Sequence, residues 1–158
     1  MKAMGVSMRC VLRSFLVVAC LLYAALSQGA DGLVSVKSSH DVQATADKLE
    51  AVLEEKGMTV MARVNHQQGA EKAGMELRPT EVLIFGNPKA GTPLMQCAQS
   101  VAIDLPQKAL IWEDENGDTW LGYNDPDYLK SRHDIEGCDD ALSKISVALE
   151  GLAKAATE

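Results

Sequence analysis

The sequence predicts an α+β fold, a two-layer sandwich in which helices cover one face of a mainly antiparallel sheet. Several short segments alternate apolar and polar residues, as strands do, whereas others repeat apolar residues at helical spacing. An Asn-Gly pair between two apolar segments near the C-terminal end indicates a hairpin of antiparallel strands. The expected order of elements is therefore β-α-β-β-α-β-β-α, in one domain over residues 28–158.

The first half of this domain contains two expected strands and one helix. Residues 32–37 alternate as a short strand, and the polar residues 38–41 are typical of a helix N-cap. A helix then ends near Gly57, with its apolar positions at Val42, Ala46, Leu49, Val52 and Leu53. The next strand, residues 58–65, is expected to form one face with Met58, Val60, Ala62 and Val64. The polar residues 66–79 predict a loop, with one helical turn around residues 70–73 as an alternative.

The second half is expected to supply three strands, two main helices and one short helix. Residues 81–85 are the most apolar strand segment, which favours a central position in the sheet. After a turn at residues 86–88, a helix opens with Thr92 as N-cap and Pro93 at its first position. The hairpin strands are expected at residues 109–112 and 119–123, a short helix at 128–133, and a terminal helix at 139–156.

The N-terminal residues have the charge and hydropathy order of a secretory signal. Lys2, Arg9 and Arg13 precede an apolar run of 12 residues, 15–26, which small and polar residues follow. A helix that crosses a hydrocarbon core of about 30 Å needs roughly 20 residues, so a permanent membrane span is disfavoured. We therefore expect a signal peptide over residues 1–27, cleaved after Ser27, with sites after Gly29 or Ala30 as alternatives. The product would be periplasmic or secreted, and it would meet the membrane only during export.

A lipid-anchored form is the alternative for this segment. Residues 17–20 end in Cys20 and resemble the box that precedes lipid attachment in bacterial lipoproteins. The apolar run continues to Leu26, however, where a lipidated chain needs a polar tether. These features favour cleavage over lipidation.

Charge excludes one class of partner. The chain has a net charge of −7, and residues 1–30 hold three of the 15 basic residues and none of the 22 acidic ones. Residues 31–158 therefore carry 12 basic and 22 acidic residues, a net charge of −10. A nucleic-acid partner is not expected, because binding to phosphates needs a basic surface.

Two cysteines remain after the expected cleavage, Cys97 and Cys138. They permit one disulfide in an oxidising compartment if the second and the terminal helix cover the same face of the sheet. Alternatively, Cys97 is a small buried apolar residue and Cys138 is free. They do not form a CxxC pair, so a thioredoxin-type redox motif is absent.

Six short sequence motifs, in a fixed order along the domain, indicate a family resemblance. They lie at residues 42–46, 64–66, 77–81, 83–88, 104–108 and 123–126. Together they resemble the bacterial and archaeal family called domain of unknown function 302, over roughly residues 32–132. The resemblance implies a compact α+β domain that tends to form homodimers, and it implies no established reaction. One departure is Asn65 before His66, where an aspartate is expected in many relatives. Asn65 cannot stabilise an imidazolium by charge, which argues against an acid–base role for His66.

The candidate ligand-binding residues are His66, Arg78, Glu81 and Asn87, which flank the strand at residues 81–85. If they converge at one end of the sheet, a histidine and a guanidinium there would bind a carboxylate or phosphate. In the alternative interpretation, Arg78 pairs with an acidic neighbour, Asn87 caps its turn and His66 donates to a backbone carbonyl.

No metal site is predicted, because the histidines, cysteines and methionines fall into no recognised ligand spacing. The acidic residues 114–118 lack the full calcium-loop pattern and are better explained as a solvated turn. The sequence identifies no cofactor, so this point stays unknown. The sequence therefore favours an exported, non-catalytic binding module for a small polar or anionic ligand. The alternatives are an enzyme with His66 as general base, or a structural interaction domain without a ligand.

Overall fold

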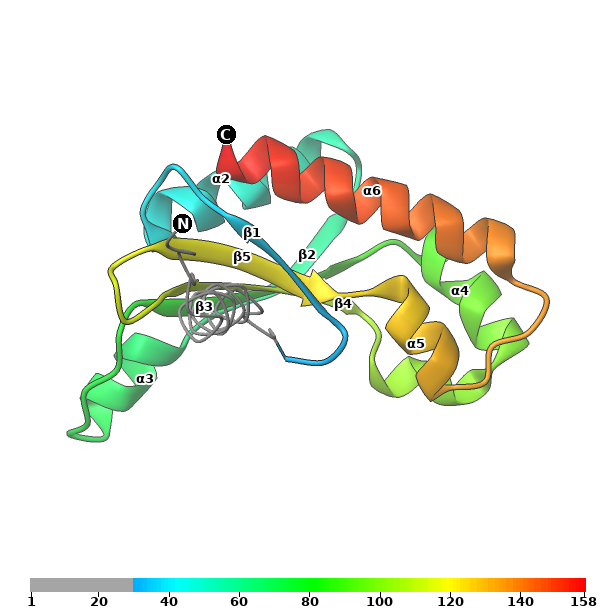
Figure 1. Cartoon of the computed structure of the whole chain (residues 1–158), viewed down its shortest axis with the longest axis horizontal. Coiled ribbons are helices and arrows are strands. Elements are labelled where there is room, and N and C mark those ends of the chain that lie inside the picture. The colour runs from blue at the N-terminus through cyan, green and yellow to red at the C-terminus, as the bar shows by residue number, and fades with distance from the viewer. Residues whose placement is uncertain (1–29) are drawn as a thin grey trace, which may run out of the picture.

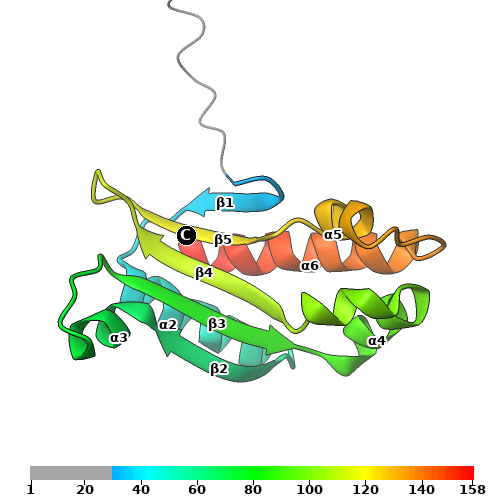
Figure 2. The ribbon, with the colours of Figure 1, turned by 90° about the horizontal axis from the view of Figure 1, so that it is seen from below.

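A computed structural model of the chain describes residues 30–158, so the predicted signal peptide, its cleavage site and Cys20 lie outside the described residues. One sheet has the strand order β1-β5-β4-β3-β2, and every neighbouring pair is antiparallel (Figure 2). The strands are β1 (Leu33–Lys37), β2 (Thr59–Asn65), β3 (Thr80–Gly86), β4 (Gln107–Glu113) and β5 (Thr119–Asn124). The α+β prediction is confirmed, and β4 rather than β3 takes the central position.

Two long helices, α2 (Val42–Glu55) and α6 (Asp139–Thr157), cover one face of this sheet (Figure 1). Their apolar stripes meet the inward residues of the strands in a core that includes Leu49, Leu53, Leu83, Phe85, Ile111, Leu121 and Leu149. Each such side chain contributes about 1.5–3 kcal/mol when it is removed from water. The main core is thus the two-layer interface that the sequence predicts.

A second cluster extends the molecule beyond one end of the sheet. It is formed by α4 (Pro88–Cys97), the 3-10 helix η1 (Gln99–Ile103), the first half of α6 and the segment that joins α5 (Pro126–Arg132) to α6 (Figure 1). Its buried residues are Leu94, Val101, Ile135 and Leu142. Residues of α6 belong to both cores. α4 contacts α6 at the end of the sheet where β3 ends and β4 begins.

Two helices begin earlier than the sequence analysis placed them, and an asparagine N-cap explains both. The Asn65 side chain accepts a hydrogen bond from the Gln68 N–H at 2.8 Å, so α3 (His66–Lys72) forms where a loop was expected. The Asn87 side chain accepts from the Lys89 N–H at 2.9 Å and starts α4 at Pro88. The expected start at Thr92 and Pro93 is therefore wrong, and Pro93 lies inside the helix.

The face assignment of β2 is also corrected. A bulge between Val60 and Ala62 places Val60 opposite Phe85 but Ala62 opposite Ile84, which lie on different faces of β3. Val60 therefore packs against the main core, whereas Ala62 and Val64 face away from α2 and α6. The sequence pattern had grouped these three residues on one face, because a bulge adds a residue without a visible signal.

Figure 2 shows the sheet from the side opposite α2 and α6. This face carries many apolar residues. By strand alternation and register they are Leu33, Ala62, Val64, Val82, Ile84, Leu110, Trp112 and Trp120. We call this set the open face. Over residues 30–158, no helix combines the length and the apolar character that a membrane crossing requires.

Candidate functional site

The structure does not bring the four predicted ligand-binding residues together. His66 is the exposed first residue of α3, and Arg78 is exposed and donates from Nε to the Glu113 carbonyl at 3.1 Å. Glu81 lies at the start of β3, opposite Asn65, whereas Asn87 follows the other end of β3. Six residues of extended strand separate these two ends by about 20 Å. The predicted convergence is therefore wrong: Asn87 belongs to a different part of the surface.

Glu81 is buried and takes part in a network that joins the two strands to α2. Its carboxylate accepts from Arg63 Nε at 2.6 Å and from Asn65 Nδ2 at 2.9 Å. The Arg63 guanidinium also contacts Asp47 at 2.5 Å and Glu50 at 3.2 Å, both on α2. Burial acts to lower the pKa of Arg63, but its hydrogen bonds to Glu81 and Asp47 outweigh burial and raise it above the ordinary value. Glu81 thus has a structural partner, and that partner is Arg63 rather than Arg78.

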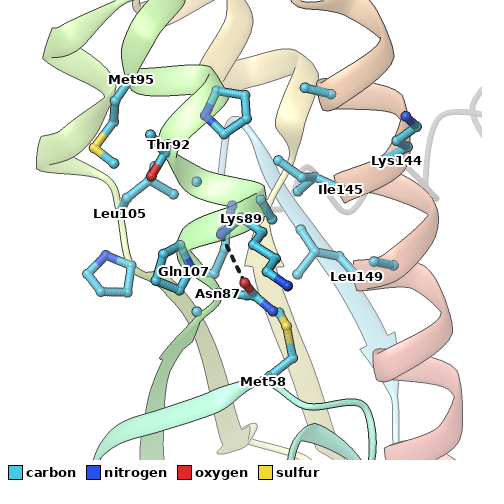
Figure 3. A pocket seen from close by; sticks show the side chains of 18 of the residues that line it. Met58, Asn87, Lys89, Thr92, Met95, Leu105, Gln107, Lys144, Ile145 and Leu149 are labelled. Carbon is cyan, nitrogen blue, oxygen red and sulfur yellow. Dashed lines mark hydrogen bonds between the residues drawn. The ribbon is translucent and has the colours of Figure 1, made fainter.

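A pocket of about 770 Å³ lies where α4 and α6 meet the ends of β3 and β4 (Figure 3). This volume falls in the range of small-molecule sites, roughly 300–1,000 Å³. The walls are mostly aliphatic, and the lining residues that form them include Met58, Met61, Pro88, Pro93, Met95, Leu105, Pro106, Ala141, Ile145, Ala148, Leu149 and Leu152. None of the described lining residues is aromatic. Asn87 is the one predicted site residue that lines this pocket.

One polar side chain in the pocket is buried and lacks a partner. Gln107 is the first residue of β4, its side chain lies on the face of the sheet that α2 and α6 cover, and it is only 7% exposed. Its Nε2 atom is fully buried and has no hydrogen-bond partner among residues 30–158. A buried donor left in this state costs about 1–3 kcal/mol. A buried amide without a partner, on a residue that lines an apolar pocket, is a candidate ligand contact.

The rim of the pocket carries more positive than negative charge. Lys89 lies in the first turn of α4 and Lys144 lies on α6, and Asp140 is the acidic residue in the lining (Figure 3). Neither lysine forms an ion pair within the described part of the chain. Two cationic groups at this opening stand out in a domain whose net charge is −10 over residues 31–158.

The two helices that wall the pocket are joined covalently. Cys97 is the last residue of α4 and Cys138 is the N-cap of α6, and their sulfur atoms form a disulfide with the Cα atoms 6.5 Å apart. The sequence analysis left this bridge and free thiols as alternatives. A bridge at this place limits how far α4 moves from α6, and it therefore stabilises the pocket walls.

A serine, a histidine and an aspartate also come together, away from the pocket. His133 Nδ1 lies 3.1 Å from Ser100 Oγ, and His133 Nε2 lies 2.6 Å from Asp104 Oδ2. His133 ends α5 and Asp104 ends η1, so the three side chains hold these two elements together. None of the three lines the pocket, and we assign them a structural role.

Metal ligands do not gather in the described residues: no group of three or more histidine, cysteine, aspartate or glutamate side chains is placed to hold an ion. The turn at residues 114–118 is organised by Asp114 instead. Its carboxylate accepts from the Asn116 and Asp118 N–H groups at 2.8 and 2.9 Å, and from Trp120 Nε1 at 2.9 Å.

The fold and the pocket define a small α+β sandwich with an antiparallel sheet and an apolar, ligand-sized cavity at one end of that sheet. The chain belongs to the family described as Domain of unknown function DUF302, which it matches over residues 34–152. The resemblance seen in the sequence is thereby confirmed. A crystal structure of an uncharacterized conserved DUF302 protein from Bacillus stearothermophilus has a TM-score of 0.72 and 20% identity. It covers 80% of this chain and 99% of that one, and it supports the fold alone.

Some curated relatives with a different name share part of the sequence. The chain is 45% identical over 120 residues to proteins named fluoride-specific ion channel FluC 1 of Brucella suis and of Brucella abortus. The match covers 76% of this chain but only 47% and 44% of those proteins. The chain thus spans less than half the length of these relatives, and their name describes a longer protein.

Proposed function

We propose that this domain is a non-catalytic binding module for a small amphipathic molecule, held in the pocket between α4 and α6. The observation that carries the proposal is the buried Gln107 Nε2, a donor without a partner at the wall of a 770 Å³ apolar cavity. Gln107 lines the pocket, so a rotation of its amide would bring a donor to an acceptor of the ligand and remove the desolvation cost, while the aliphatic walls would bury the rest of the ligand. The expected small polar or anionic ligand thus becomes a molecule with one polar end.

The enzymatic alternative has less support. His66 is exposed, has no side-chain hydrogen bond within the described residues and lies outside the pocket lining. A general base needs a group that orients it and a place for the substrate beside it. The purely structural alternative, without any ligand, leaves the unpaired Gln107 amide unexplained.

We further propose that the domain acts outside the cytoplasm after cleavage of residues 1–27. The charged start and the apolar run of 12 residues support export, and a disulfide between Cys97 and Cys138 suits an oxidising compartment. N-terminal sequencing of the exported form is expected to begin between Gln28 and Asp31. An intact Met1, or a lipid on Cys20, would contradict export by cleavage.

Ligand binding is tested on protein purified from its own cell envelope by native mass spectrometry, followed by solvent extraction. We expect an additional mass of a small molecule that denaturation releases. Ala148→Trp fills the pocket opening from α6 and is expected to abolish the additional mass, together with the fluorescence of added Nile red. Ala155→Trp on the exposed side of the same helix is the matched control and should retain both. A wild-type protein that holds no extra mass and no Nile red, or equal binding by Ala148→Trp, would overturn the proposal.

A further inference from the structure

We infer that the ligand of this pocket is an acyclic aliphatic acid, a flexible hydrocarbon chain that ends in an anionic oxygen group. The inference rests on the proposed function and specifies its ligand class. Three independent features of the lining support it: the composition of the walls, the charge of the rim and the position of the unpaired amide. Each feature excludes other ligand classes.

The walls fit an apolar molecule better than a nucleobase. Nucleobases and similar polar rings are held by stacking on aromatic side chains together with hydrogen bonds, and none of the described lining residues provides an aromatic surface. Three methionines, Met58, Met61 and Met95, line the cavity instead. Methionine side chains are unbranched and adapt to irregular apolar shapes, so these walls accommodate an aliphatic chain in several conformations.

The rim supplies the charge complement of an acid. Lys89 and Lys144 belong to the pocket lining and come from two different helices (Figure 3). Asp140 offsets only one of these two charges. Both lysines are exposed, so their ammonium groups are accessible to an anion. They attract an anionic head group to one opening of a domain that is otherwise strongly acidic.

Gln107 then distinguishes an oxygen-bearing head group from a plain hydrocarbon. Its Nε2 donates a hydrogen bond and the lysine ammonium groups also donate, so the polar end of the ligand must accept. A carboxylate accepts hydrogen bonds from amide and from ammonium donors, and a phosphate monoester has the same chemistry. An alcohol of equal chain length has only one oxygen and no charge to meet the lysines.

The test measures how dodecanoate, dodecyl phosphate and dodecanol displace Nile red from the protein after unfolding and refolding have removed any bound ligand. We expect dodecanoate to compete at least 10-fold better than dodecanol. The phosphate arm identifies the head group: stronger competition than dodecanoate indicates a phosphate ligand, and weaker competition indicates a carboxylate. Either result supports an anionic end. Equal competition by dodecanol and dodecanoate would refute the inference.

Charge variants locate the effect. A double variant, Lys89→Met with Lys144→Met, is expected to lose the preference for dodecanoate over dodecanol while it still binds Nile red. Lys154→Met removes a lysine from the same helix outside the pocket lining and should keep the preference. A double variant that keeps the full preference would also refute the inference. If Nile red binds the wild type but no acid displaces it, the binding module stands and the ligand class is wrong; if Nile red does not bind, the proposed function itself fails.

Discussion

Replacement of Gln107 by methionine is expected to make the empty protein more stable and a poorer binder. Glutamine and methionine have similar length and shape, so Gln107→Met removes the amide without opening a cavity. The Nε2 atom is buried without a partner, and such a donor costs about 1–3 kcal/mol. The variant should therefore raise the free energy of unfolding by about 1–2 kcal/mol, less than the full cost because the native chain relaxes around the amide. A residue that lowers stability at a binding site is typical of functional positions.

Urea denaturation of the refolded, ligand-free protein measures this change, with the midpoint and the slope fitted separately. Gln99→Met is the matched control, because Gln99 is exposed and its replacement should change stability by less than about 0.5 kcal/mol. The same Gln107→Met protein should bind dodecanoate at least 5-fold more weakly than the wild type. A loss of stability of 1 kcal/mol or more would show that the amide is satisfied in the folded protein, and the reasoning from Gln107 would be refuted.

Three further results are expected. Thiol titration of unfolded, unreduced protein that begins at Asp31 should detect no free thiol, and two free thiols per chain would contradict the bridge. Cys97→Ser should lower the free energy of unfolding by about 3–4 kcal/mol, because the bridge closes a loop between residues separated by 41 positions. The hydrogen bond from Trp120 and those from the turn backbone lower the pKa of Asp114 below its ordinary 3.8, so its contribution is present at neutral pH and is lost as the pH falls below that value. Asp114→Asn should accordingly destabilise the protein at pH 7 and progressively less as the pH falls below 3.8. An effect that stays constant down to the acid limit of folding would contradict this role of the Asp114 carboxylate. We expect a homodimer in which two open faces are in contact, so light scattering should give twice the mass of the chain. Val64→Glu should give the mass of the monomer. A monomeric wild type would exclude the dimer.

Local sequence signals predicted the fold well, since each main element carries its own pattern. The alternation in β3, the Asp41 N-cap of α2 and the Asn-Gly turn between β4 and β5 all depend on neighbouring residues. Two boundaries failed where similar signals compete. Both Asn87-Pro88 and Thr92-Pro93 are typical of a helix start, and α4 begins at the first of them, where the Asn87 side chain caps the Lys89 N–H. The bulge in β2 gives no signal at all, because it depends on pairing with β3.

The site could not be predicted in the same way, because its parts are distant in sequence. The candidate residues were chosen for their chemistry and for their nearness to one strand, and this choice treated Glu81 and Asn87 as neighbours although β3 separates them. The pocket instead combines residues from 58 to 152, and most of them are ordinary aliphatic residues that any core contains. Gln107 was overlooked because a glutamine at the start of a strand is unremarkable until its burial is known. What makes it informative is the absence of a partner among residues 30–158, a property of the folded environment that a sequence does not display. A search for function in this fold therefore begins with buried polar atoms that the protein leaves unsatisfied, and only then turns to its exposed histidines and arginines.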